Sequence, residues 1–247
     1  MVHKKRNKEK VSAIIPVHNE EKTIANVIGV LKKCYYIDEI IVVDDFFFFN
    51  TRKKIENFSD IIYLRNKKNL GKGNSLNKGA KIAKNNNLLF CDGDYLNLKN
   101  SHLKKVIKPV ISGKKDMFIG VGKSNYNHKK VSSERIRLSF FVAGLRCLKR
   151  ERWTKLPKIY KKGYRTEIGL TYYCNRYGKG WGYVFLDYSW VMKWGKKSFP
   201  KGVLLHIKMY LDLAIAYSFT NTIGFFSYWF KRFLISMGFL PKDYLLR

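Results

Sequence analysis

The feature that most constrains this chain is a short apolar run that stops abruptly at two acids. Residues 88–91 are Leu, Leu, Phe and Cys, and Asp92, Gly93 and Asp94 follow directly. Buried residues followed at once by carboxylates are typical of a central strand that carries charge to the edge of a sheet. Ligands of open α/β sheets bind at the carboxyl ends of the strands. We therefore expect a ligand site at this edge.

Asp92 and Asp94 have the chemistry of a divalent-metal site. Carboxylate oxygens are hard ligands that suit Mg²⁺ or Mn²⁺, and an ion held there would in turn bind a diphosphate. Gly93 would let a ligand approach the backbone closely. The alternative is a plain polar turn after the strand, since Asp-Gly is a common turn dipeptide. This stretch alone does not decide between the two.

Around this stretch, predicted strands alternate with predicted helices. The strands are expected at 11–17, 40–43, 61–64, 88–91 and 116–120, and helical patterns follow at 24–31, from about 74 to 85, and from 163. This alternation predicts βαβ units and a largely parallel sheet, hence an α/β fold. The second strand also ends in paired acids, Asp44 and Asp45. Two strands would then deliver carboxylates to one edge.

Two further features carry open alternatives. Gly71, Lys72 and Gly73 stand at a predicted helix entry, where backbone N–H groups and the lysine would meet a phosphate, but a plain loop explains them equally well. Glu167 is the only acid between Glu151 and Asp187. An ion pair with a neighbouring arginine and a catalytic or acceptor-binding role both remain open for it.

Composition limits the partners. Lys and Arg number 49 against 18 Asp and Glu, a formal net charge of +31, which favours an anionic partner: nucleic acid, phosphorylated small molecules or an anionic membrane surface. No zinc spacing, helix-turn-helix pattern or aromatic RNA-binding signature is present, so we expect no specific nucleic-acid binding. The four cysteines lie far apart without a C-x-x-C pair, which argues against a disulfide framework or zinc knuckle and favours a reducing compartment.

The C-terminal part differs in character from about residue 203. Residues 213–230 carry no charge, and Lys231 and Arg232 follow directly. A stretch of roughly 18 uncharged residues is near the lower limit for crossing a bilayer. Because polar residues sit in its middle and aromatic residues are frequent, we expect amphipathic helices that lie in the membrane interface. A true span and a helical hairpin packed on the sheet are the alternatives.

Six short motifs, in their order along the chain, carry a resemblance to a known family. They are IIPVHNE (14–20), IVVDD (41–45), NLGKG (69–73), LFCDGD (89–94), AGLR (143–146) and GYRTEI (163–168). The order and spacing of these motifs resemble family 2 glycosyltransferases with the GT-A fold, the group that includes polyprenyl-phosphate sugar transferases and glucosyl-3-phosphoglycerate synthases. The resemblance covers residues 11–170 and favours the metal interpretation of Asp92 and Asp94.

The resemblance implies a Rossmann-like GT-A glycosyltransferase domain, which we expect over residues 1–202. The uncharged stretch predicts a hydrophobic, helical, membrane-associating segment at 203–247. The resemblance also implies roles for individual residues. Those expected to bind the nucleotide sugar are Pro16, His18, Glu20, Asp45, Lys72 and Asp92. Those expected to bind Mg²⁺ or Mn²⁺, as the family's D-x-D motif does, are Asp92 and Asp94. Those expected to be catalytic are Asp94, Arg146 and Glu167, with Arg146 stabilising developing charge or holding an anionic acceptor.

The function expected from this resemblance is transfer of a hexose from a nucleotide-diphosphate sugar, of the UDP-glucose or GDP-mannose class, to a phosphorylated acceptor. We expect a lipid-linked acceptor such as polyprenyl phosphate at the cytoplasmic face of a membrane, either peripherally or through a single span. A soluble acceptor such as 3-phosphoglycerate in the cytoplasm is the alternative. The sequence is also compatible with a homo-oligomer.

Two departures from the family pattern have consequences for activity. Four phenylalanines, 46–49, replace a Gly-Ser-x-Asp loop, which raises the alternative of a catalytically impaired nucleotide-sugar-binding scaffold. The histidine that often completes the metal site is absent from positions 190–193 after Asp187. Any third ligand would then be water, the diphosphate or His206.

Overall fold

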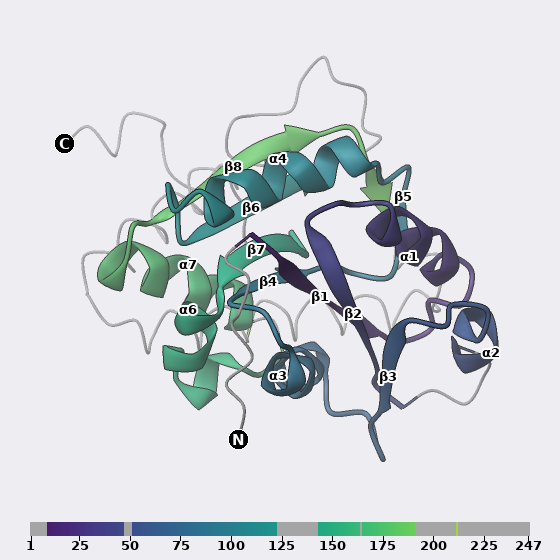
Figure 1. The fold of residues 1–247 in the computed structure, drawn as a ribbon. Coiled ribbons are helices and arrows are strands. Elements are labelled where there is room, and N and C mark those ends of the chain that lie inside the picture. Colours follow the sequence, from purple (N-terminus) through teal and green to yellow (C-terminus); the bar gives the residue numbers. More distant parts are fainter. Residues whose placement is uncertain (1–8, 47–50, 123–142, 164, 191–210, 212–247) are drawn as a thin grey trace, which may run out of the picture.

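A seven-stranded sheet runs through the middle of the molecule, in the order β3-β2-β1-β4-β7-β6-β8 (Figure 1). The computed structural model describes residues 9–46, 51–122, 143–163, 165–190 and 211. The strands of this sheet are β1 (Val11–Val17), β2 (Ile37–Asp44), β3 (Ile61–Arg65), β4 (Asn87–Phe90), β6 (Met117–Gly122), β7 (Leu145–Lys149) and β8 (Trp181–Leu186). A separate antiparallel pair consists of β5 (Tyr95–Leu96) and β9 (Ser189–Trp190).

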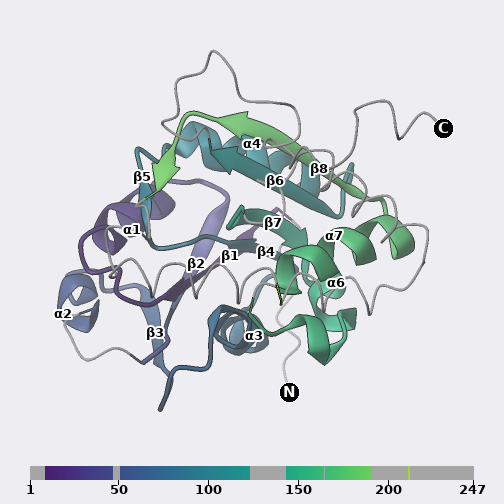
Figure 2. The same cartoon turned by 180° about the vertical axis from the view of Figure 1, so that it is seen from behind.

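Helices cover both faces of the sheet (Figure 2). They are α1 (Ile24–Lys32), α2 (Thr51–Ile55), α3 (Lys72–Ile82), α4 (Asn100–Ile111), α6 (Arg150–Lys155) and α7 (Arg165–Tyr177), with a 3-10 turn η1 (Lys158–Tyr160). On one face, alternate residues of β1 such as Ala13 and Ile15 pack in a core with α1 and α4. On the other face, Ile14 packs in a core with α3, α6 and α7. A strand buried on both faces is expected to be mainly apolar, as β1 is apart from Ser12, whose hydroxyl is hydrogen-bonded.

The predicted α/β fold with a mostly parallel sheet is confirmed. β1 pairs in parallel with β2 and β4, β2 with β3, and β6 with β8. β7 is the exception, because it runs antiparallel to both of its neighbours, β4 and β6. Neither β7 nor β8 was predicted from the sequence. The other five strands lie where the apolar runs predicted them, within a few residues at their ends.

The connection between β1 and β4 defines the place where a ligand is expected. From β1 the chain adds β2 and β3 on one side, and it then returns to add β4 on the other side of β1. This reversal is a topological switch point, and the loops that follow the two strands open a crevice there. The loop after β4 begins at Cys91 and contains Asp92 and Asp94.

Several sequence-based expectations fall outside the described residues. These are the segment 203–247 apart from Leu211, the phenylalanines at 47–49, and His206. The domain boundary at 202/203 therefore stays a prediction. Among the helices that the structure describes, none combines the length and hydropathy that a bilayer crossing requires.

Truncation of the β1 core should cost stability. Ile14 of β1 is fully buried against the helices on its face of the sheet. Ile14→Ala should therefore lower the free energy of unfolding by about 3 kcal/mol, through lost burial and a residual cavity. Ile82, at the end of α3, is 46% exposed. Ile82→Ala is the matched control and should change the free energy of unfolding by less than about 0.5 kcal/mol. Urea denaturation of both variants measures the difference. Equal losses would contradict the placement of Ile14 in the buried core of the sheet.

Candidate active site

The loops that follow β1, β2 and β4 are bonded to one another at the switch point. The Asp45 backbone N–H donates to the Val17 carbonyl at 2.9 Å, and His18 Nδ1 lies 3.2 Å from the Asp45 carbonyl oxygen. The Thr23 hydroxyl donates to the Gly93 carbonyl at 2.6 Å. Three segments that are distant in sequence therefore form one continuous rim at the carboxyl edge of the sheet.

Asp45 holds the loop that leads into α3. Its Oδ1 accepts the Leu70 N–H at 2.8 Å and the Asn66 side-chain amide at 2.8 Å, and its Oδ2 accepts the Gly71 N–H at 2.7 Å. Gly71 adopts φ 83°, a conformation that glycine reaches without strain. Asp45 therefore fixes the backbone immediately before Lys72. Its predicted contact with the base or ribose of a nucleotide stays a prediction.

Lys72, at the start of α3, forms the centre of a charged cluster. Its ammonium lies 2.9 Å from Asp92 Oδ1 and 3.1 Å from Glu167 Oε1. The Glu167 side chain is only 3% exposed, whereas those of Lys72 and Asp92 are 24% and 28% exposed. Burial alone would lower the pKa of Lys72, but the two carboxylates outweigh it and raise that pKa well above its usual value. The lysine therefore stays protonated at any working pH.

Asp92 is confined from its other side by Gly144. A Cβ atom at position 144 would overlap the Asp92 carboxylate, so only glycine leaves room for it there. Asp94 is 8% exposed and lies in the same loop. Burial raises the pKa of the neighbouring Tyr95 well above its usual value, and the charges of Tyr188, Asp92 and Asp94 contribute to that shift. The loop after β4 therefore carries two carboxylates, with Asp94 more deeply buried than Asp92.

Arg146 connects β7 to the start of α7. It is 2% exposed, and its Nε donates to the Ala143 carbonyl at 2.8 Å while Nη1 donates to the Glu167 carbonyl at 3.3 Å. Burial lowers the pKa of Arg146 from its usual value, and the charge of Glu167 opposes this shift. The ion pair expected of Glu167 is present, but its cation is Lys72. Arg146 instead holds the backbone at Glu167, and its predicted catalytic role stays a prediction.

The remaining predicted residues lie along the same rim. Pro16 is in β1 and pairs with Val43 of β2. His18 and Glu20 follow the end of β1. Glu20 packs against the loop after β4, since a Cβ atom at Gly93 would lie 3.3 Å from Glu20 Cβ. The structure thus brings the predicted residues together at one edge of the sheet. Their binding and catalytic roles stay predictions.

Two residues of this site were not assigned a role from the sequence. Asn66 is buried and donates from its amide to both Asp45 Oδ1 and Ser75 Oγ, so it links the end of β2 to α3. A lone asparagine in a polar loop gives no sequence signal for such a bridge. Gly144 was noticed as part of a motif, but its contact with Asp92 depends on tertiary structure alone.

The donor set suits a magnesium or manganese ion that is shared with a diphosphate. In the described part of the chain, no group of three or more His, Cys, Asp and Glu side chains is arranged to hold a metal by itself. Mg²⁺ is commonly bound by one or two carboxylates, with substrate phosphates and water completing its shell. Two carboxylates, those of Asp92 and Glu167, share the one ammonium of Lys72, and Glu167 Oε2 is a buried oxygen without a hydrogen-bond partner in the described structure. The residues present therefore fit such an ion.

Comparison with known proteins decides the family. A model described as Glycosyl transferase family 2 matches residues 12–178. The chain belongs to glycosyl transferase family 2. It is therefore a glycosyltransferase, and the matched region contains every residue of the charged cluster. An uncharacterized protein of Methanocaldococcus jannaschii is 33% identical over 145 residues, which span 55% of this chain and 60% of that protein.

Solved structures with the same fold include glucosyl-3-phosphoglycerate synthase from Mycobacterium tuberculosis. Its complex with phosphoglyceric acid superposes with a TM-score of 0.68 at 18% identity, covering 84% of this chain and 80% of that chain. Its complex with Mn²⁺, UDP-glucose and phosphoglyceric acid gives a TM-score of 0.68 at 19% identity, covering 84% and 79%. At this level of identity the likeness concerns the fold, and the predicted GT-A-like architecture of this glycosyltransferase is confirmed.

The contact between Gly144 and Asp92 gives a specific test of this glycosyltransferase. Gly144→Ala should displace the Asp92 carboxylate and lower sugar transfer by about 100-fold, because small misplacements of binding groups have effects of this size. Gly29 in α1 has open space around it, so Gly29→Ala is the matched control and should transfer sugar at the wild-type rate. Steady-state assays, with circular dichroism to verify folding, measure both. A fully active Gly144→Ala variant would contradict the placement of Asp92.

Proposed function

We propose that this glycosyltransferase moves a hexose from a nucleotide-diphosphate sugar to a phosphorylated acceptor, with a divalent cation at Asp92 and Asp94. The observation that carries the proposal is the cluster of Asp92, Lys72 and Glu167 beside the β1/β4 switch point. A nucleotide sugar brings a diphosphate, which needs both a cation and hydrogen-bond donors. This cluster supplies carboxylates for the cation and a lysine for the diphosphate.

The donor is proposed to lie across the rim formed by the loops after β1, β2 and β4. Pro16, His18, Glu20 and Asp45 would then contact the base and ribose, as the family resemblance implies. UDP-glucose is the first candidate, because the fold neighbour from Mycobacterium tuberculosis was solved with Mn²⁺ and UDP-glucose. GDP-mannose is the second donor to test.

A divalent ion bound there would neutralise the charge that develops on the departing nucleoside diphosphate. The chain's own residues set the geometry around it. Gly144 leaves the room that the Asp92 carboxylate occupies, and the protonated ammonium of Lys72 would donate to diphosphate oxygens. Arg146 holds the backbone of Glu167 at the inner side of the cluster. A phosphorylated acceptor is already an anion, so this site needs no strong general base.

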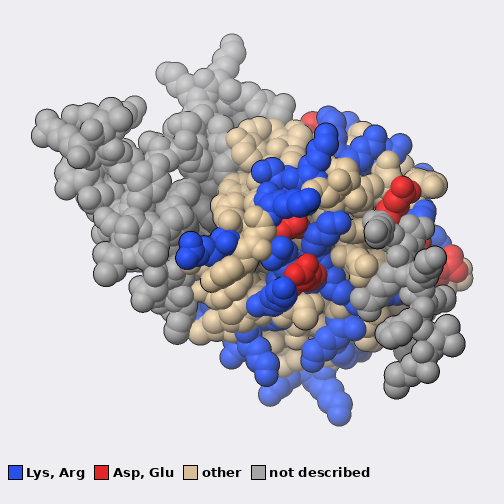
Figure 3. Space-filling view, turned by 60° about the vertical axis from the view of Figure 1, so that its left-hand side comes forward, with Lys and Arg blue, Asp and Glu red and all other residues tan. Residues whose placement is uncertain are grey.

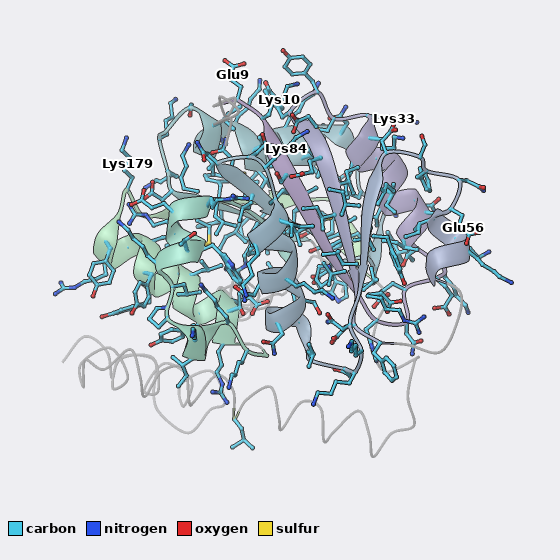
Figure 4. All side chains as sticks on the ribbon, turned by 60° about the horizontal axis from the view of Figure 1, so that its bottom comes forward. Glu9, Lys10, Lys33, Glu56, Lys84 and Lys179 are labelled. Carbon is cyan, nitrogen blue, oxygen red and sulfur yellow. The ribbon has the colours of Figure 1, made fainter. Side chains whose placement is uncertain are left out.

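For the acceptor we propose a small phosphorylated molecule of the 3-phosphoglycerate type. The supporting observation is that fold neighbours were solved with phosphoglyceric acid and with glycerol 3-phosphate. The basic character of the chain fits any anionic acceptor. Figure 3 shows lysine and arginine side chains spread over one face with few acids among them. In Figure 4 the labelled Lys179 and Lys33 lie on opposite sides of the molecule, and Lys10 and Lys84 lie near each other between them.

A polyprenyl phosphate at a membrane is the second candidate acceptor. It is favoured by the uncharged stretch 213–230 with Lys231 and Arg232 directly after it, and by the net charge of +31. With this acceptor the chain would act at the cytoplasmic face of a membrane.

Phe46 bears on whether nucleotide binding survives the unusual loop. Phe46 has φ 55°, a left-handed conformation that is unusual for a bulky residue, and it stands where the family pattern has glycine. The Asp45 carboxylate nevertheless keeps its bonds to Leu70 and Gly71. The loop that carries Lys72 is therefore held in place despite this substitution, which favours turnover over a scaffold role.

The role of the two acids is testable by nucleoside diphosphate release. With Mn²⁺, UDP-glucose and 3-phosphoglycerate, Asp92→Asn and Asp94→Asn should each lower UDP release by about 100-fold or more, since each removes a charge from the cation site. Asp60→Asn is the control, because Asp60 is an exposed partner of Lys32 far from the cluster. Chelation of the metal should abolish release. Unchanged turnover in both site variants would refute the proposed role.

The acceptor class is tested by supplying each candidate to the full chain. We expect sugar transfer to 3-phosphoglycerate in the absence of lipid, measured by mass spectrometry of the product. Transfer only to polyprenyl phosphate in detergent micelles would replace this acceptor by the second candidate. Binding of nucleotide sugars without release of nucleoside diphosphate from any donor would instead indicate a scaffold.

A further inference from the structure

The ammonium of Lys72 is saturated by carboxylate oxygens. It lies 2.9 Å from Asp92 Oδ1, 3.0 Å from Asp92 Oδ2 and 3.1 Å from Glu167 Oε1. An ammonium group has three donors, and three carboxylate oxygens lie within reach of them. Lys72 thus lies beside Asp92 where another cation would bind. A divalent ion at Asp92 would compete with this lysine for the same carboxylate.

The two carboxylates that hold Lys72 differ in their surroundings. The Glu167 side chain is 3% exposed and lies in the interior, whereas that of Asp92 is 28% exposed. Separating a buried charge from its counter-charge is costly, while a partly exposed carboxylate can exchange one cation for another. Of the two contacts, the one between Lys72 and Asp92 is therefore the one that can be given up.

The contacts favour the lysine side chain as the group that moves. Asp92 lies directly against Gly144, and the backbone of Lys72 is fixed through the bonds between Asp45 and Gly71. The lysine side chain is a flexible four-carbon stem, so it can change partners without movement of the backbone. Glu167 Oε2 has no hydrogen-bond partner in the described structure and is available to accept an N–H that leaves Asp92.

We propose that Lys72 is a built-in counter-cation of the donor-free enzyme, and that Glu167 is the positioning residue that retains it. When the donor's diphosphate and its metal ion arrive, Lys72 leaves Asp92, stays anchored on Glu167, and donates to the diphosphate. This inference rests on the proposed metal site at Asp92. It adds that metal binding without nucleotide is weakened by the protein's own lysine, so that metal and diphosphate bind cooperatively.

Isothermal titration of the full chain with Mn²⁺ alone tests the competition. Lys72→Met should bind Mn²⁺ at least about tenfold more tightly than the wild type, because a unit charge next to the site has been removed. At saturating Mn²⁺, the same variant should bind UDP about tenfold more weakly, since a charge-assisted hydrogen bond to the diphosphate is lost. Lys81→Met, an exposed residue in the last turn of the same helix, is the control and should change neither affinity.

A double variant separates direct competition from a general charge effect. Lys72→Met combined with Glu167→Gln leaves the net charge of the cluster as in the wild type. Direct competition predicts that the double variant still binds Mn²⁺ more tightly than the wild type, and a general charge effect predicts wild-type affinity. Glu167→Gln alone should weaken Mn²⁺ binding, because Lys72 then keeps Asp92 as its charged partner in this cluster. The loss of Mn²⁺ affinity caused by Glu167→Gln should be smaller when Lys72→Met is also present.

The outcomes also distinguish this inference from the proposed function. If wild-type Mn²⁺ binding requires Asp92 but Lys72→Met binds Mn²⁺ no more tightly, the counter-cation role is wrong while the metal site stands. If neither protein binds Mn²⁺ at a site that Asp92→Asn removes, the proposed metal site is wrong and the inference is overturned with it.

Discussion

The candidate site depends on how one ammonium group is shared between two carboxylates. Lys72 begins α3, Asp92 follows β4, and Glu167 lies in the first turn of α7. This single contact therefore ties together three elements from different parts of the chain. Because Glu167 is almost fully buried, its charge needs a partner, and Lys72 supplies it. The same need fixes the ammonium at the place where a donor diphosphate would enter.

The residues around this contact hold the backbones that carry Lys72 and Glu167 in place. The Asp45 carboxylate accepts two backbone N–H groups ahead of α3, and Arg146 donates to the Ala143 carbonyl before β7 and to the Glu167 carbonyl in the first turn of α7. Both anchors are buried, so the backbones that carry Lys72 and Glu167 are held from within the protein. The side chains that face the crevice are then the ones left to exchange partners.

The fold was largely predictable from the sequence, because apolar runs mark strands buried on both faces, and acids at their ends mark the carboxyl edge. β7 escaped prediction, since its short run around Arg146 mixes apolar and charged residues and its antiparallel direction is set by tertiary packing. At the site, Asp92 was predictable from its position after a strand. The partner of Glu167 was not, because Lys72 is 95 residues away in sequence and no periodicity connects them.

The most direct test of the central claim is the position of Mn²⁺ in crystals grown with UDP, located by anomalous scattering at the manganese edge. Our account predicts a peak at bonding distance from the carboxylates of Asp92 and Asp94 and from the diphosphate oxygens, with the Lys72 ammonium turned from Asp92 toward the diphosphate. A peak elsewhere, or bound UDP without manganese at these acids, would contradict it.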